Sequence, residues 1–155
     1  MFRYEFGHRY SAHRHYRVPV DRVDITRMRH VHELFRNVNR LGMGDNENDL
    51  TRAPIDGSWS HVLDVGTEFG SWALSFGLAY PDILVKGVDT CPIQTRVRPP
   101  NVSFEMFDVD EGILGVKEEF DLVHFQDMDG CLARTSRVMD RAFEYVAYSS
   151  CSRSD

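Results

Sequence analysis

Residues 61–70 read His-Val-Leu-Asp-Val-Gly-Thr-Glu-Phe-Gly, and this stretch is the most informative part of the chain. Alternating apolar residues precede Gly66, which is typical of a buried strand that turns sharply into a helix. In an open parallel sheet, ligands bind at the carboxyl ends of the strands. The segment between Gly66 and Gly70 is therefore a candidate ligand-binding loop, although any strand-to-helix turn can need a glycine for its backbone alone.

The composition bounds the class of protein. A chain of 155 residues is long enough for one core and too short for two domains of ordinary size. Its 42% hydrophobic and 27% charged residues suit a soluble globular protein, and no apolar run could span a membrane. Without a secretory signal at the amino terminus, a cytoplasmic or nuclear location is expected. The cysteines have no paired spacing, which predicts free thiols at Cys91, Cys131 and Cys151.

Charge is distributed unevenly along the chain. Residues 1–40 contain nine arginines and four acids, a charge of +5, whereas residues 41–155 carry −11. A basic segment can bind nucleic acid, but the acidic remainder of the same chain is the simpler partner, and no aromatic-basic motif of an RNA-binding module is present. We therefore expect neither nucleic-acid nor membrane binding.

Residues 1–58 are expected to form an irregular arm over 1–20, an amphipathic helix and a polar linker over 42–58. Asp21 or Asp24 would cap the first turn of the helix, and Gly42 with Gly44 would end it. The apolar residues that recur at helical spacing are Met28, Val31, Leu34, Phe35, Val38 and Leu41.

Residues 59–155 are expected to form a partial ligand-binding domain with a parallel α/β sheet. Short apolar runs predict strands at 62–65, 83–88, 102–107 and 120–125. An apolar helix over 72–80 would be stopped by Pro81, and a second helix is expected over 131–148. Four strands with a crossover helix predict a Rossmann-like parallel sheet with flanking helices. The expected apolar positions of the second helix are Leu132, Val138, Met139, Phe143 and Val146.

Two His-x-His pairs, His13 with His15 and His30 with His32, raise the question of a metal site. Residues two apart on a helix point to different sides, so His30 and His32 cannot share one ion unaided. No metal site is expected.

Each of three successive predicted strands ends in an acid or a glycine at the edge where ligands bind. The residues are Asp64 with Gly66, then Asp89, then Asp108. A carboxylate after the second strand can accept two hydroxyl hydrogen bonds from a ribose. Asp108, followed by Val109, can accept a hydrogen bond from an adenine amino group. The set predicts an adenosine pocket, although each acid alone is more often an ordinary capping carboxylate.

The loop differs from that of dinucleotide-binding proteins. Its glycines, Gly66 and Gly70, do not follow the Gly-x-Gly-x-x-Gly order, and a charge at Glu68 would repel a diphosphate. A cationic adenosine compound fits better, and a nicotinamide-dependent oxidoreductase is the weaker alternative.

A longer pattern extends from the loop in both directions. Downstream it continues through Trp72-Ala73, Gly87-Val88-Asp89, Cys91-Pro92-Ile93-Gln94 and Pro99-Pro100-Asn101-Val102. The amino-terminal part contributes Tyr4, Gly7, Arg9-Tyr10, Ala12, Tyr16, Pro19, Asp21, Arg27, His32 and Phe35. This combination, over residues 4–147, resembles the class I S-adenosylmethionine-dependent methyltransferases and within them is similar to the fungal LaeA-like group.

The resemblance implies S-adenosylmethionine as cofactor and names the residues that would bind it. Asp64, Gly66 and Gly70 would hold the methionine portion, Asp89 the ribose, and Asp108 with Val109 the adenine. No side chain is expected to be catalytic, although His124 and Gln126 lie where an acceptor could make a polar contact, His124 more often being a core histidine. The complete implied set is Asp64, Gly66, Thr67, Gly70, Asp89, Thr90, Asp108 and Val109.

Two features depart from the family pattern. Glu68 stands where the family has glycine, and the turn expected after Arg141-Ala142-Phe143-Glu144 is missing, so the fold is expected to stop before its fifth strand. The fourth strand would then be an exposed apolar edge. The resemblance implies a methyltransferase that acts on a small-molecule or protein acceptor, with fungal secondary metabolism as one setting. The alternative is a catalytically inactive module that binds a protein partner at the exposed edge.

Overall fold

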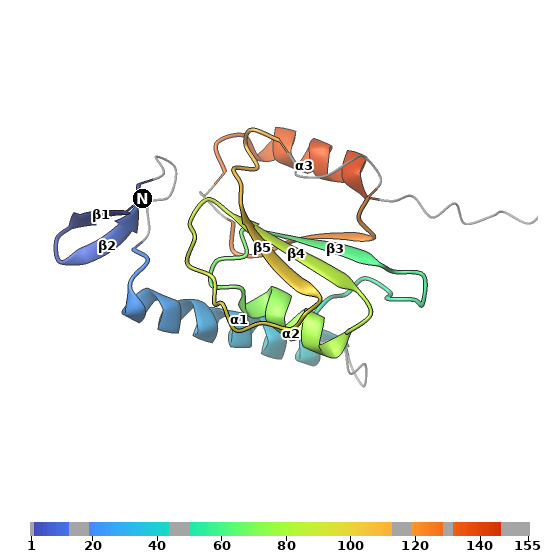
Figure 1. The fold of residues 1–155 in the computed structure, drawn as a ribbon. Coiled ribbons are helices and arrows are strands. Elements are labelled where there is room, and N and C mark those ends of the chain that lie inside the picture. Colours follow the sequence, from blue (N-terminus) through green and yellow to red (C-terminus); the bar gives the residue numbers. More distant parts are fainter. Residues whose placement is uncertain (1, 13–18, 44–49, 113–118, 129–131, 147–155) are drawn as a thin grey trace, which may run out of the picture.

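The computed structural model describes residues 2–12, 19–43, 50–112, 119–128 and 132–146. Figure 1 shows three layers, in which helices α1 and α2 cover one face of a sheet and α3 covers the other. The helices are α1 (Arg22–Met43), α2 (Ser71–Ala79) and α3 (Thr135–Tyr145). The sheet strands are β3 (His61–Val65), β4 (Leu84–Asp89), β5 (Val102–Met106) and β6 (Leu122–Phe125).

The sheet is parallel and has the order β5-β4-β3-β6, which confirms the predicted Rossmann-like α/β sheet. Val62 of β3 lies opposite Val85 of β4 on one side and Leu122 of β6 on the other. The chain thus builds outward from β3 to β5 and then crosses to the far side of β3. This reversal creates a topological switch point between β3 and β6, where ligands bind in open α/β sheets.

Successive residues of β3 pack into two separate cores, because strand side chains alternate between the faces of a sheet. Val62 packs with Phe76 and its neighbours on the face that α2 covers. Leu63 and Val65 pack with Val138 on the face that α3 covers. Asp64 falls on the α2 face, and its carboxylate therefore needs polar partners there.

The amino-terminal segment was expected to be irregular, and this prediction was wrong. Strands β1 (Phe2–Glu5) and β2 (His8–Ser11) form an antiparallel hairpin. The connecting residues Phe6 and Gly7 both have positive φ, 51° and 81°, which is the backbone that a two-residue hairpin turn requires. Residues 13–18 lie outside the described part of the chain.

Helix α1 begins where the sequence predicted, because Oδ1 of Asp21 accepts a hydrogen bond from the Val23 amide at 3.0 Å. Its buried face differs from the predicted apolar positions. Met28 and His32 are buried, whereas Leu34 is 61% and Leu41 88% exposed. The apolar residues of α1 recur on two sides of the helix, and only one side packs against the rest of the domain.

The predicted polar linker over 42–58 is partly core. Leu50 is buried in the α2-face cluster, and its carbonyl accepts a hydrogen bond from Nε1 of Trp72 at 2.8 Å. Because the residues around Leu50 are polar, the sequence did not indicate that Leu50 is buried. Residues 44–49, including Gly44, lie outside the described part.

The carboxyl-terminal elements agree with the sequence only in part. Helix α3 buries Val138 and Ala142, whereas Phe143, expected on the apolar face, is 72% exposed. Strand β6 is an edge of the sheet as expected, but its side chains are half buried between the two cores. The Phe120 amide donates to the Tyr145 carbonyl at 3.0 Å, beside a parallel bridge from Phe120 to Val146. Among the described helices, none combines the length and apolar character that a membrane span needs.

Candidate functional site

The loop between β3 and α2 lies at the switch point, and its conformation depends on two glycines. Gly66 and Gly70 have φ of +70° and +92°, a region that residues with side chains rarely adopt. A Cβ at Gly70 would lie 2.5 Å from Cζ of Phe104, and one at Gly66 would collide with Sδ of Met128. The backbone of the loop is therefore closely surrounded by β5 and by the segment after β6.

Asp64 joins the loop to β6. Its carboxylate is almost fully buried, with Oδ2 accepting a hydrogen bond from Oγ1 of Thr67 at 2.7 Å. Oδ1 lies 2.8 Å from Nδ1 of His124. The His124 ring stacks on Trp72 with 3.8 Å between centroids. His124 thus has partners in the core, as a structural histidine does.

Asp89 joins the loops that follow β3 and β4. Oδ2 accepts a hydrogen bond from the Glu68 amide at 2.9 Å, and Oδ1 accepts one from the Cys91 amide at 2.8 Å. Burial raises the pKa of Asp89 to about 6, while these backbone donors favour its charged form. Asp89, the residue predicted to bind the ribose, is therefore also the residue that fixes the position of Glu68.

Glu68 has a φ of 51°, which explains why glycine suits this position of the loop. Burial raises the pKa of its carboxyl to about 7; the charge of Arg27 opposes the shift, and Asp89 adds to it. Its carbonyl accepts a hydrogen bond from Nε2 of Gln94 at 2.7 Å. The loop thus brings acidic side chains together in a partly buried environment.

A small cavity of about 20 Å³ lies under α1, next to the loop. It has room for about one water molecule. Three of the predicted site residues line it: Asp64, Gly66 and Thr67. The other five lie outside its lining: Gly70, Asp89, Thr90, Asp108 and Val109.

The residues after β5 belong to the same sheet edge. The Phe107 amide donates to the Asp89 carbonyl at 2.9 Å, which ties the end of β5 to the end of β4. Oδ1 of Asp108 accepts a hydrogen bond from the Asp110 amide at 2.9 Å, and Val109 is buried in the α3-face core. Asp108 and Val109 therefore lie at the expected edge, within a turn of their own.

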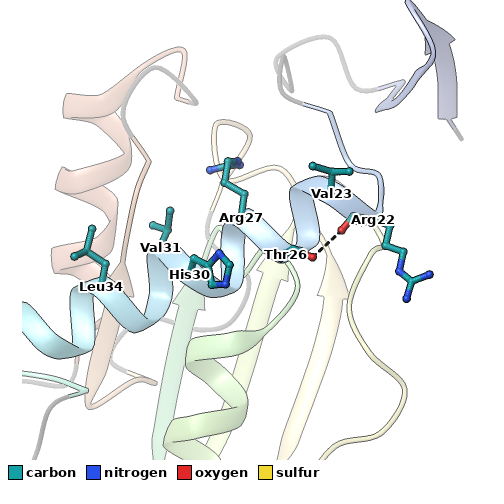
Figure 2. Close-up of a pocket in the computed structure, with 7 residues that line it drawn as sticks. All are labelled: Arg22, Val23, Thr26, Arg27, His30, Val31 and Leu34. Carbon is teal, nitrogen blue, oxygen red and sulfur yellow. Dashed lines mark hydrogen bonds between the residues drawn. The ribbon is translucent and has the colours of Figure 1, made fainter.

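Two wider hollows flank the cavity. One of about 310 Å³ lies between Phe35 of α1 and Met139 of α3, and Gln126 lines both it and the small cavity. The other, of about 700 Å³, is open and runs along the outer face of α1, from Arg22 to Leu34 (Figure 2). Gln126 therefore stands between the loop and a space that an acceptor could occupy.

Sequence reasoning missed His32 as a site residue. It lines the small cavity, is only 5% exposed, and places Nε2 3.3 Å from Oγ of Ser75. Nδ1 of the same ring is buried and has no hydrogen-bond partner among the residues that the structure describes. Burial lowers the pKa of His32. Only its position on the buried side of α1 reveals this role, because helical periodicity does not show which side of a helix packs inward.

His8 and His30, unlike His32, lie outside the lining of the small cavity. His30 is exposed and lines the outer hollow (Figure 2), whereas His32 lines the small cavity. His13 and His15 lie outside the described residues. Nδ1 of His8 lies 2.6 Å from Oδ2 of Asp21, close to Asp24, but Asp21 already caps α1.

Comparison with known proteins gives consistent relatives. No family model matches the chain. It is 29% identical to methyltransferase pytC of Aspergillus terreus over 148 residues, which cover 94% of this chain and 43% of the relative. It is 32% identical to the secondary metabolism regulator laeA of Aspergillus flavus over 145 residues, which cover 92% of this chain and 37% of the relative. The chain thus spans about two fifths of the length of these relatives.

A solved structure shares the fold. A chain from the complex between the Haloferax volcanii Trm112 methyltransferase activator and a methyltransferase superposes with a TM-score of 0.59 at 17% identity. The match covers 80% of this chain and 53% of that one. At this identity the likeness concerns the fold alone.

Proposed function

Since this chain is a relative of the LaeA-like fungal methyltransferases over most of its length, we propose that it binds S-adenosylmethionine and takes part in methyl transfer. The observation that carries the proposal is the loop between β3 and α2. It lies at the switch point of the sheet, and an acid stands at or just after the carboxyl end of each of β3, β4 and β5.

The cofactor would lie across the ends of β3, β4 and β5. Asp64, Gly66, Thr67 and Gly70 hold the methionine portion in this proposal. Asp89 with Thr90 holds the ribose, and Asp108 with Val109 holds the adenine. When bound, the cofactor supplies an electrophilic methyl group on a sulfonium sulfur.

The residues present suit such a group in charge and backbone, but the space must widen. Acidic side chains at Asp64, Glu68 and Asp127 favour the sulfonium and ammonium charges of S-adenosylmethionine. Gly66 lets the ligand approach the backbone closely. Because the cavity holds about one water molecule, binding requires α1 or the segment with Met128 to move outward.

Methyl transfer requires little from the protein beyond positioning the acceptor and the cofactor. A methyl group is transferred when an acceptor lies in line with it, and holding two reactants in such a geometry supplies much of the rate. Gln126 is the side chain best placed to orient the acceptor, because it lines both the small cavity and the hollow between α1 and α3. The acceptor is a small molecule or a protein, and no side chain is proposed as a base.

A second function follows from a different observation. Leu34, Val38 and Leu41 leave an apolar stripe exposed on α1, and contiguous apolar surface often marks a binding site for another protein. A non-catalytic methyltransferase-fold module that binds a protein partner there, or at the β6 edge, is the alternative. Methyl transfer separates it from the first proposal.

Calorimetric titration of the 155-residue chain with S-adenosylmethionine tests the first proposal, with NADH as the control ligand. A ligand at 100 times its dissociation constant stabilises the fold by about 2.7 kcal/mol, which thermal unfolding also detects. Asp64→Asn should weaken binding, whereas Asp82→Asn, an exposed aspartate remote from the loop, should not. A folded chain that binds no S-adenosylmethionine would overturn the proposal and favour the interaction module.

A further inference from the structure

We infer that Nδ1 of His32 donates a hydrogen bond to the carboxylate of the cofactor's amino-acid part, which the first turn of α2 also binds. The inference rests on the proposed function, because it assumes that an adenosine compound with an amino-acid tail occupies the loop. It gives the buried side of α1 a role in ligand binding as well as in packing.

The first argument is the state of the His32 ring. Its side chain is more than nine-tenths buried and lines the cavity, yet within the described part of the chain Nδ1 has no hydrogen-bond partner. Buried polar atoms in native proteins are nearly always paired, and each exception calls for an explanation. A ligand that arrives in the cavity would supply the missing partner.

The second argument is that the ring is already oriented. Nε2 lies 3.3 Å from Oγ of Ser75, one turn along α2 from Ser71. If the serine hydroxyl donates to Nε2, the imidazole carries its proton on Nδ1 and becomes a donor there. The contact between α1 and α2 thus leaves a buried donor on a ring that lines the cavity.

The third argument is the chemistry of the surrounding groups. Ser71 and Trp72 of the first turn of α2 line the same cavity, and Gly70 offers no side chain to cap their amides. A helix amino terminus with free amides attracts anions. The acids Asp64, Glu68 and Asp127 can take the ammonium of an amino acid, so its carboxylate needs the donors that His32 and α2 provide.

Two amide substitutions separate this role from packing. In His32→Asn the side-chain amide can replace Nδ1, and in His32→Gln it can replace Nε2 and keep the Ser75 contact. Binding is measured by calorimetry with two probes, S-adenosylhomocysteine and 5′-methylthioadenosine, since the second lacks the amino-acid part. Urea unfolding of each variant shows that it is folded before titration.

We expect His32→Gln to weaken S-adenosylhomocysteine about tenfold to a hundredfold and to leave 5′-methylthioadenosine unchanged, as for the loss of a hydrogen bond to a charged group. His32→Asn should bind S-adenosylhomocysteine within about threefold of the original chain. The ¹⁵N shift of Nδ1 should change with the first probe and not with the second. Equal binding by His32→Gln, or an equal loss for both probes, would overturn the inference and leave the proposed function standing. An original chain that binds neither probe would overturn both.

Discussion

Nδ1 of His124 lies 2.8 Å from Oδ1 of Asp64, so two parallel strands exchange a side-chain hydrogen bond at the end where the loop begins. The other carboxylate oxygen is held by Thr67, and the histidine ring is held by Trp72. Asp64, which is proposed to bind the methionine portion of the cofactor, is therefore oriented before any cofactor binds. Such preorganisation reduces the ordering cost of binding.

Replacing His124 by phenylalanine should destabilise the fold by about 1–3 kcal/mol, because the buried Asp64 carboxylate loses a partner while the stacking on Trp72 is kept. Urea unfolding measures the loss. Adding Asp64→Asn to the same chain should recover part of it, since the neutral amide is less costly to bury. Additive effects of the two substitutions would show that the pair is not coupled.

Alanine at Gly70 should cost more than alanine at either of two matched glycines. Gly70→Ala adds both a strained φ of +92° and a collision with Phe104. Gly7→Ala adds only the strained φ, because no atom lies within 4 Å of its Cβ position. Gly57→Ala adds neither. Thermal unfolding should rank them in that order, with Gly57→Ala within about 0.5 kcal/mol of the original and Gly70→Ala losing about 2 kcal/mol or more. A Gly70→Ala loss no larger than that of Gly7→Ala would mean that Phe104 yields freely.

The sheet was predictable because its information is local. Each strand of the parallel sheet is short and rich in apolar residues, and residues 61–70 already contain a strand, a turn and a helix start. The hairpin was missed because its turn, Phe6 with Gly7, has only one residue typical of such turns. Phe143 was misplaced because periodicity shows which residues share a side of α3 and not which side meets the sheet.

The site was predictable only for residues at the carboxyl ends of strands. Asp64, Asp89 and Asp108 could be placed at one edge because parallel strands share their carboxyl end. His32 could not, since its role depends on how α1 lies over the loop, a tertiary arrangement that no local pattern encodes. Nor could the sequence reveal that Asp89 already accepts two backbone hydrogen bonds. That these residues bind the cofactor stays a prediction.

Glu68→Gln should stabilise the chain at high pH and not at low pH. The folded pKa of Glu68, about 7, lies above its ordinary value of 4.5, so the folded state retains the proton longer than the unfolded state. Stability from this group is complete below pH 4.5 and is lost as the pH rises through 7. The free energy of unfolding of Glu68→Gln, measured with urea, should exceed that of the original chain at pH 8 by about 1–3 kcal/mol and match it at pH 4.5. Glu111→Gln, at an exposed position, should show no such difference; a pH-independent effect of Glu68→Gln would rule out the titration of this carboxyl.

Asn101→Asp should be more damaging than Asn101→Ala, although it changes fewer atoms. Nδ2 of Asn101 lies 3.0 Å from the Gly77 carbonyl oxygen, 3.1 Å from that of Tyr80 and 2.9 Å from that of Ile83. It therefore links the end of α2 to the segment that leads into β4. A carboxylate there would face three acceptors without a proton to donate, at a cost of about 3 kcal/mol or more at pH 7, against about 1–3 kcal/mol for alanine. Lowering the pH should reduce the deficit of the aspartate variant, since its protonated form regains one donor. Urea unfolding at pH 7 and pH 4 measures both effects, with the exposed Asn37→Asp as the matched control. An aspartate variant no less stable than the alanine variant would show that the carbonyls can turn away from position 101.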